Sequence, residues 1–248
     1  MCLIAFFYRA LDEYPLVLAA NRDEFFDRQG TLPGRLTGGI VAGLDPVRGG
    51  TWLGAAGGGG APTIAAVSNI GLGRPADPAA RSRGLLCLDV LAAAPDESLA
   101  QALEENCRRH IYNDFNLLLA RDGDVVLATQ TGGRLKVRSL AANRGSKPVL
   151  IGNAPPPSQE PKLQRARRLI IRQDSIEKTI EALKLACGDH GDRPDRSDAL
   201  CIHDHNRGTL SSTIIALHAR DAGKHIYLHA QGAPCSTAYE DFSHLLRA

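Results

Sequence analysis

Apolar residues gather in short runs of strand length at the start of the chain. Residues 2–8 and 15–20 are two such runs, joined by the polar stretch 9–14, and they predict a pair of neighbouring strands. Residues 28–60 are rich in Gly, Pro and Thr, which predicts loops around short strands. Residues 63–67 then resume as a buried strand. The chain therefore begins inside a sheet.

The middle of the chain changes from helical to strand patterns. Residues 81–94 and 96–108 predict two helices, the second opened by Pro95 and Asp96, which favour a helix start. Asp-Gly and Gly-Gly pairs, which are typical of hairpin turns, then separate the next apolar runs. These runs predict an antiparallel meander of strands over residues 116–120, 125–130 and 134–140.

The last part of the chain repeats this alternation of strands and helices. It predicts a strand over 149–152, helices over 162–172 and 175–186, a hairpin of 212–219 with 225–231, and a short closing helix over 239–246. Strands and helices in such blocks fit antiparallel sheets covered by helices better than alternating βαβ units. We therefore expect an α+β sandwich formed by one domain, residues 1–248.

Composition and charge narrow the class of protein. A chain of 248 residues that is 44% hydrophobic can build one substantial core. The 29 basic and 27 acidic residues are interspersed and give a net charge of +2, so neither nucleic acid nor a membrane is an expected partner. No apolar stretch approaches the length of a membrane span, and no secretory signal is visible. We expect a soluble, cytoplasmic protein.

The cysteines are dispersed along the chain without a Cys-x-x-Cys pair, which argues against a disulfide framework and against a zinc site. His203-Asp204-His205 offers two imidazoles but no obvious further ligands. We interpret this segment as a polar loop and expect no metal site. The six cysteines are Cys2, Cys87, Cys107, Cys187, Cys201 and Cys235.

Cys2 is the strongest chemical candidate. Aminopeptidases remove Met1 before small residues, which would leave a residue with both a thiol and a free α-amine. The amine titrates near pH 7.7–8 and an ordinary thiol near 8.5, so the amine can take the thiol proton. Nucleophile and base would then be one residue. The alternative is that the chain starts with Met-Cys by chance.

Four polar residues, Asn21-Arg22-Asp23-Glu24, end the second apolar run. A buried strand that ends in charges delivers them to the end of its sheet, where Cys2 could lie. Arg22 could lower the pKa of the thiol and Asp23 could hold the amine. The alternative is a solvated turn with a local ion pair. Strand alternation places Arg22 with Glu24, and Asn21 with Asp23, on opposite faces, so both pairs cannot face Cys2 unless the strand twists or ends at Asn21.

Three asparagines, Asn69, Asn116 and Asn153, stand at the ends of expected strands. A side-chain amide there can donate a hydrogen bond to a developing oxyanion, whose loss typically costs about 2.7–4 kcal/mol of barrier. The same amide can equally cap a turn. The pattern leaves both roles open.

Several spaced blocks occur in a distinctive order over nearly the whole chain. They are Met1-Cys2, Leu18-Ala19-Ala20-Asn21-Arg22-Asp23-Glu24-Phe25, Gly43-Leu44-Asp45, Gly49-Gly50-Thr51-Trp52-Leu53-Gly54, Ser68-Asn69, Arg81-Ser82-Arg83-Gly84, Phe115-Asn116-Leu117, Gly152-Asn153-Ala154 and Ser211-Ser212-Thr213-Ile214. In these blocks the chain resembles the NRDE family, also called the transport and Golgi organisation protein 2 family.

The resemblance implies a four-layer αββα sandwich of the Ntn-hydrolase kind, similar to choloylglycine hydrolases and penicillin V acylases. It implies attack of a Cys2 nucleophile on a C–N amide bond, an acyl-enzyme and its hydrolysis, without a required cofactor. The carried-over roles are Asp23 orienting the amine, Arg22 polarising the thiol, and Asn69 with Asn153 donating to the oxyanion or substrate. The expected substrate-binding residues are Asn21, Glu24, Trp52 and Asn116.

The resemblance also supports a different class of function. Eukaryotic members are discussed in haem mobilisation and in acyl-CoA or lipid homeostasis, so the same cleft could bind such an amphipathic ligand without catalysis, with Cys2 or a histidine on a haem iron. A third alternative is a scaffold in which Cys2 merely begins a strand. The chain departs from the family pattern at Leu210, where many members have Arg, unless Arg207 substitutes. It also has His229-Ala230-Gln231 where an acidic residue is common.

Overall fold

The computed structural model describes residues 2–57, 62–71, 73, 75–93, 97–142, 145 and 147–247. The predicted removal of Met1 and the helix start predicted at Pro95 and Asp96 concern residues outside these ranges, as does the end of the predicted loop region, residues 58–60.

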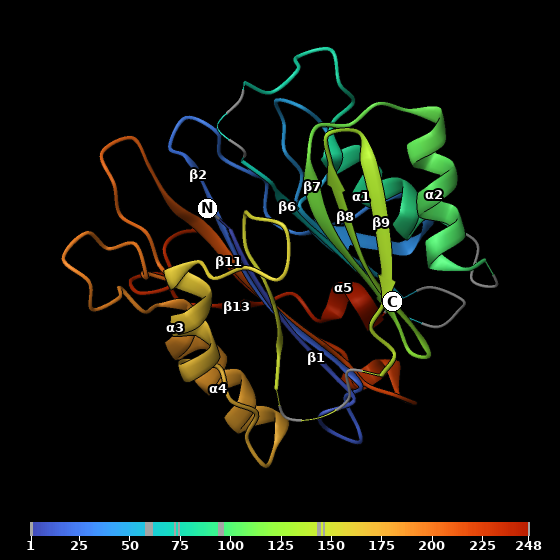
Figure 1. The fold of residues 1–248 in the computed structure, drawn as a ribbon. Coiled ribbons are helices and arrows are strands. Elements are labelled where there is room, and N and C mark those ends of the chain that lie inside the picture. Colours follow the sequence, from blue (N-terminus) through green and yellow to red (C-terminus); the bar gives the residue numbers. More distant parts are fainter. Residues whose placement is uncertain are drawn as a thin grey trace.

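The first sheet joins both ends of the chain. Its strand order is β10-β1-β2-β11-β12-β13, with every neighbouring pair antiparallel, and β1, β2 and β11 cross Figure 1 side by side as long ribbons. The predicted first strand pair and last hairpin are therefore confirmed. The strands are β1 (Leu3–Tyr8), β2 (Leu16–Phe25), β10 (Val149–Ile151), β11 (Arg207–Leu217), β12 (Ile226–Ala230) and β13 (Glu240–Asp241).

The second sheet is a continuous antiparallel meander in chain order, β3-β4-β5-β6-β7-β8-β9. The meander predicted over residues 116–140 forms its last three strands. The strands are β3 (Gly34–Arg35), β4 (Ile40–Ala42), β5 (Leu53–Ala56), β6 (Thr63–Asn69), β7 (Phe115–Arg121), β8 (Asp124–Thr131) and β9 (Arg134–Ser139), with the 3₁₀ turn η1 (Thr37–Gly39) before β4.

Each sheet carries two helices on its outer side (Figure 1). Ser82 and Ser175 cap α1 and α4, because their hydroxyl oxygens accept hydrogen bonds from the first helical turns. The pairs are α1 (Arg83–Leu91) with α2 (Leu99–Arg109), and α3 (Pro161–Leu169) with α4 (Ile176–Cys187). The shorter elements are η2 (Ala222–Lys224) and α5 (His244–Arg247).

Alternation along the central strands builds three apolar layers. In β1, Ile4 and Phe6 point into the core between the two sheets, whereas Ala5 and Phe7 pack against α3 and α4. A third cluster joins α1 and α2 to the outer face of the second sheet. The order of layers is therefore helices, sheet, sheet, helices, and the predicted four-layer αββα sandwich is confirmed.

Two predicted boundaries were wrong. The strand expected to stop near Ala20 continues through Asn21-Arg22-Asp23-Glu24 to Phe25, paired along this length with β11. The closing helix expected over 239–246 begins as the strand Glu240–Asp241, and only His244–Arg247 is helical. Glu240 and Asp241 are extended because their main-chain groups form hydrogen bonds with the edge strand β12.

Membrane insertion was not expected from the sequence. Among the described residues, no helix is both long enough and apolar enough to span a bilayer.

Candidate active site

Cys2 lies in the wall of a cavity of about 420 Å³ whose residues come from both sheets and from the start of α1. Seven of the nine residues expected at the site line this cavity, with Cys2 and Arg22 on the side of the first sheet. The predicted site residues in the wall are Cys2, Arg22, Asp23, Glu24, Trp52, Asn69 and Asn153, while Asn21 and Asn116 are absent from it.

The register between β1 and β2 decides which side chains face Cys2. Leu3 pairs with Asn21, so Cys2, the residue before β1, lies alongside Arg22. Ala20 points into the core between the sheets and Ala19 toward the helices. Continuing this alternation along β2, Arg22 and Glu24 lie on the inter-sheet side, and Asn21 and Asp23 lie on the side of α3 and α4.

The two residues on the helix side are bound within the protein. The Asn21 side-chain amide donates to the carbonyl oxygens of Cys187 and Leu200, at 2.9 Å each. Asp23 accepts a hydrogen bond from Thr209 Oγ1 at 2.6 Å and forms an ion pair with Lys162 Nζ at 2.6 Å. The ion-paired side chains of Lys162 and Asp23 are only 3% and 1% exposed. Asn21, expected to bind substrate, instead joins β2 to the segment after α4.

The Cys2 thiol sits close to the main chain of β2, with Sγ 3.9 Å from the carbonyl oxygen of Asp23. Burial raises the pKa of the thiol above its ordinary value and the charge of Asp23 raises it further, while Lys162 acts in the opposite direction. The net shift is upward because burial is its largest cause, and the contribution of Arg22 to lowering this pKa stays a prediction.

Arg22 and Glu24 make different contacts on the cavity side. The Arg22 guanidinium lies over the Trp52 ring, 4.5 Å from its centroid, and donates to the carbonyl oxygen of Arg28. Glu24 pairs with Arg28 at 2.9 Å, and Arg28 also pairs with Asp45 at 2.5 Å. Two carboxylates of the wall are thus bound to one guanidinium.

The asparagines divide into two roles. Asn153 Nδ2 donates to the carbonyl oxygen of Asn69 at 2.6 Å and to Ser68 Oγ at 3.2 Å, so its amide hydrogens are engaged. The Asn69 side chain is exposed in the cavity wall. Asn116 is fully buried and donates to the carbonyl oxygens of Gly152 and Ala154. Asn116 therefore holds the turn that carries Asn153 and does not reach the cavity.

Two glycine-containing blocks meet beside Trp52. Thr51 N donates to the carbonyl oxygen of Gly84 at 3.0 Å. Gly50 has a φ of +81°, and a Cβ there would lie 2.1 Å from the Gly84 carbonyl carbon, so no larger residue fits. This close approach brings Arg83, which precedes Gly84, to the cavity that Trp52 lines.

Arginines dominate the wall, which sequence reasoning did not foresee. Among the described residues, six arginines and three carboxylates line the cavity, and the six are Arg22, Arg28, Arg48, Arg81, Arg83 and Arg207. Arg28 and Arg81 have carboxylate partners. Within the described ranges, Arg22, Arg48 and Arg83 donate to main-chain carbonyl oxygens instead. Burial and the neighbouring Arg28 lower the pKa of Arg83 to about 10, so it stays cationic at neutral pH.

The departure at Leu210 has a structural counterpart. The pairing of β11 with β2 shifts between Thr209 and Ser211, so Leu210 is the extra residue of a bulge, and its side chain is buried. Arg207, three residues earlier, lines the cavity. A cationic side chain from β11 is thus present, as the alternative at Arg207 anticipated.

Lys162 is the other functional candidate that the sequence did not reveal. It lies 139 residues from Asp23 along the chain, in the first turn of the amphipathic helix α3. Local periodicity carries no signal for such a partner. The Arg81-Ser82-Arg83-Gly84 block was the one available pointer to Arg83.

The chain is similar to a known protein family over most of its length. The family description "Transport and Golgi organisation 2" matches residues 1–226. A mouse (Mus musculus) protein named "Transport and Golgi organization 2 homolog" is 36% identical over 139 residues, covering 51% of this chain and 49% of the mouse protein. A human (Homo sapiens) protein named "Transport and Golgi organization protein 2 homolog" is 37% identical over 139 residues, with the same coverage.

The chain spans about half the length of the curated relatives it matches. The family match, in contrast, extends over most of the chain and includes both Cys2 and the residues of β2 and β11 around the cavity. By this match, the chain belongs to the Transport and Golgi organisation 2 family.

Proposed function

We propose that the protein is an N-terminal-nucleophile amidohydrolase in which Cys2 attacks the C–N amide bond of a small or acyl substrate. The observation that carries the proposal is the position of Cys2 in a cavity wall, with the Asp23–Lys162 ion pair beside it. A buried ion pair at the end of a strand is costly to maintain, which favours a chemical use for it. A cytoplasmic location, where thiols remain reduced, is part of the proposal.

The reaction would use the α-amine of Cys2 after removal of Met1. The amine accepts the thiol proton, the sulfur attacks the carbonyl carbon, and the C–N bond breaks as the leaving nitrogen takes that proton. Water then hydrolyses the thioester, which releases a carboxylic acid and restores Cys2. The exposed amide of Asn69 is the better candidate for an oxyanion donor, because the amide hydrogens of Asn153 are engaged.

The charge of the wall indicates the kind of substrate. Arg22, Arg48 and Arg83 donate only to carbonyl oxygens in the part of the chain that the structure describes, so their charges are not neutralised by a bound carboxylate. A guanidinium group binds carboxylate and phosphate well. We therefore infer that the substrate carries an anionic group in addition to its amide.

The alternative function is binding of an amphipathic ligand without catalysis. The arginines would suit the phosphates of an acyl-CoA as well as they suit an anionic substrate. Haem is less well supported, because no histidine is among the described residues that line the cavity, which leaves Cys2 as the axial ligand there.

The experiment is a turnover assay with N-acyl amides offered in matched anionic and neutral forms. We expect hydrolysis by the wild type, a preference for the anionic form, and no hydrolysis by Cys2→Ala. Arg83→Met should reduce the anionic preference while retaining Cys2 chemistry. Tight binding of acyl-CoA without turnover of any amide, unchanged in Cys2→Ala, would favour the binding function instead.

A further inference from the structure

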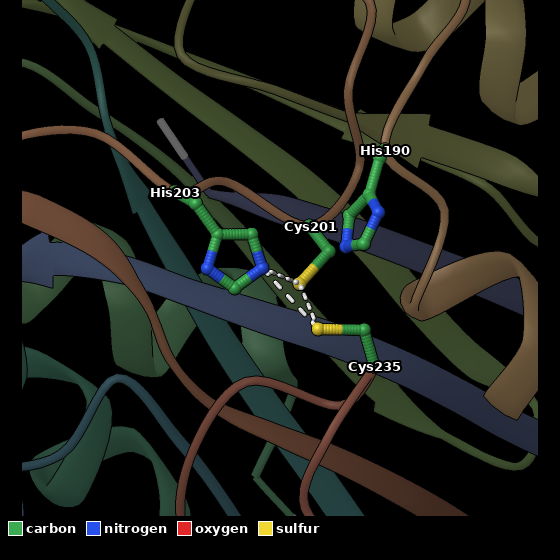
Figure 2. Close-up of side chains that lie close together, drawn as sticks. All are labelled: His190, Cys201, His203 and Cys235. Atoms are coloured by element: carbon green, nitrogen blue, oxygen red, sulfur yellow. Dashed lines mark hydrogen bonds between the residues drawn. The ribbon is translucent and has the colours of Figure 1, made fainter.

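A second cluster of reactive side chains lies outside the cavity of Cys2. His190, Cys201, His203 and Cys235 each direct one potential ligand atom into a common space, and these four atoms lie within 4.8 Å of one another (Figure 2). None of the four belongs to the wall of the Cys2 cavity. The residues come from separated segments, which is why their spacing did not predict a metal site.

The distances match a tetrahedral site. With Zn–S near 2.3 Å and Zn–N near 2.0–2.1 Å, tetrahedral geometry separates two sulfur ligands by about 3.8 Å and a sulfur from a nitrogen by about 3.6 Å. The Cys201 and Cys235 sulfurs are 3.7 Å apart, and His203 Nε2 is 3.6 Å from Cys201 Sγ and 3.2 Å from Cys235 Sγ. A disulfide would need about 2.05 Å between the sulfurs.

The main chain holds the ligands in place without help from a metal. The carbonyl oxygen of Asp189, beside His190, accepts hydrogen bonds from the main-chain nitrogens of Leu200 and Cys201. His203 bridges to Gly208 as the chain enters β11. Cys235 lies in the turn between β12 and β13. Hydrogen bonds from the main-chain nitrogens of Ser236 and Thr237 to the Ala233 carbonyl oxygen stabilise this turn.

The arrangement also connects the cluster to the Cys2 cavity. Leu200, next to Cys201, supplies a carbonyl oxygen that accepts from Asn21. Cys201 and His203 line a second cavity, and Arg207 belongs to the walls of both. An ion at the cluster would therefore stabilise the segment that leads to Arg207 and to Thr209, the hydrogen-bond partner of Asp23.

We propose that His190, Cys201, His203 and Cys235 bind one Zn²⁺ ion as a structural site. Two thiolates and two imidazoles are a ligand set that zinc prefers, and four protein ligands leave no open position for substrate. The site is independent of the hydrolase proposal, since its ligands take no part in the chemistry of Cys2.

The test measures zinc in the full chain. Reduced protein, freed of metal and then titrated with Zn²⁺ against a chromophoric chelator, should bind one equivalent. Co²⁺ in place of Zn²⁺ should show a thiolate-to-cobalt charge-transfer band and the intense visible bands of a tetrahedral ion. Elemental analysis of the protein as purified should show zinc near one ion per chain.

Matched variants assign the ligands. Cys235→Ser and His190→Ala should lose stoichiometric binding and the zinc-dependent rise in melting temperature. Cys107→Ser and His205→Ala change the same residue types outside the cluster and should keep both. Circular dichroism establishes that each variant is folded.

Two results would overturn the proposal. One is reduced, folded wild-type protein that binds no equivalent of Zn²⁺ or Co²⁺. The other is binding that persists unchanged in Cys235→Ser and His190→Ala. A Cys201–Cys235 disulfide in the isolated protein, found by peptide mass spectrometry, would count against the zinc site if reduction does not restore metal binding.

Discussion

Polar and charged side chains make different contacts on the two faces of the Asn21-Arg22-Asp23-Glu24 segment. On the helix side, Asn21 and Asp23 are buried and bound to Cys187, Leu200, Thr209 and Lys162. On the cavity side, Arg22 lies on Trp52, and Glu24 shares a partly exposed ion pair with Arg28.

The difference teaches that one motif can anchor a strand within the protein on one face and line a cavity on the other. Alternation along a strand separates the two tasks without any insertion in the chain. Polar residues on the helix side continue the strand because their partners lie inside the protein, so β2 does not end in a solvated turn. The comparison predicts larger losses of stability on the helix side and larger effects on ligands on the cavity side.

The largest expected effect is at the buried ion pair. Asp23→Ala removes the buried carboxylate that pairs with Lys162 and should lower the free energy of unfolding by about 3–5 kcal/mol. Urea denaturation followed by the fluorescence of Trp52, the single tryptophan, measures this change. The double variant Asp23→Leu with Lys162→Met removes both charges and should recover much of the loss. Equal losses in both variants would contradict the ion-pair account.

A smaller effect is expected at Asn21. Asn21→Ala leaves two buried carbonyl oxygens without their donor and should cost about 1–3 kcal/mol of unfolding free energy. Asn69→Ala provides the matched control, because this asparagine is exposed in the cavity wall and its side chain makes no such bond to another described residue. If the control lost as much stability as Asn21→Ala, the division between the two faces would be wrong.

The smallest effect on stability is expected at Glu24. Glu24→Gln removes one partner of an ion pair that stays partly exposed, so the loss should remain below about 1 kcal/mol. The same change frees Arg28 from one carboxylate and should tighten the binding of an anionic ligand. Isothermal titration with a carboxylate product measures this gain. Weaker binding in Glu24→Gln would show that Glu24 contacts the ligand directly.

Much of the fold could be predicted because alternation and turn residues act locally. The meander after residue 115 and the strand pair at the start follow from two-residue periodicity and Gly-containing turns. The extension of β2 could not be predicted, since it depends on Lys162 and Thr209, which lie far away in the chain. Hydrophobic patterns carry no information about such polar partners.

The candidate site was predictable to the extent that motifs mark it. Cys2, Arg22 and Trp52 come from family blocks and meet at the cavity. Asn116 lies in a block too, but it is buried behind the turn of Asn153, and a sequence block alone does not show the role of its residues. The four proposed zinc ligands do not follow a spacing typical of metal-binding motifs, and only the folded chain brings them together.

The most direct test of the central claim is the intact mass of the purified protein before and after incubation with anionic N-acyl amides. The account predicts a chain without Met1 that gains the mass of one acyl group in the wild type and no added mass in Cys2→Ala. A chain that retains Met1, or an acyl adduct that persists in Cys2→Ala, would contradict the assignment of Cys2 as the N-terminal nucleophile.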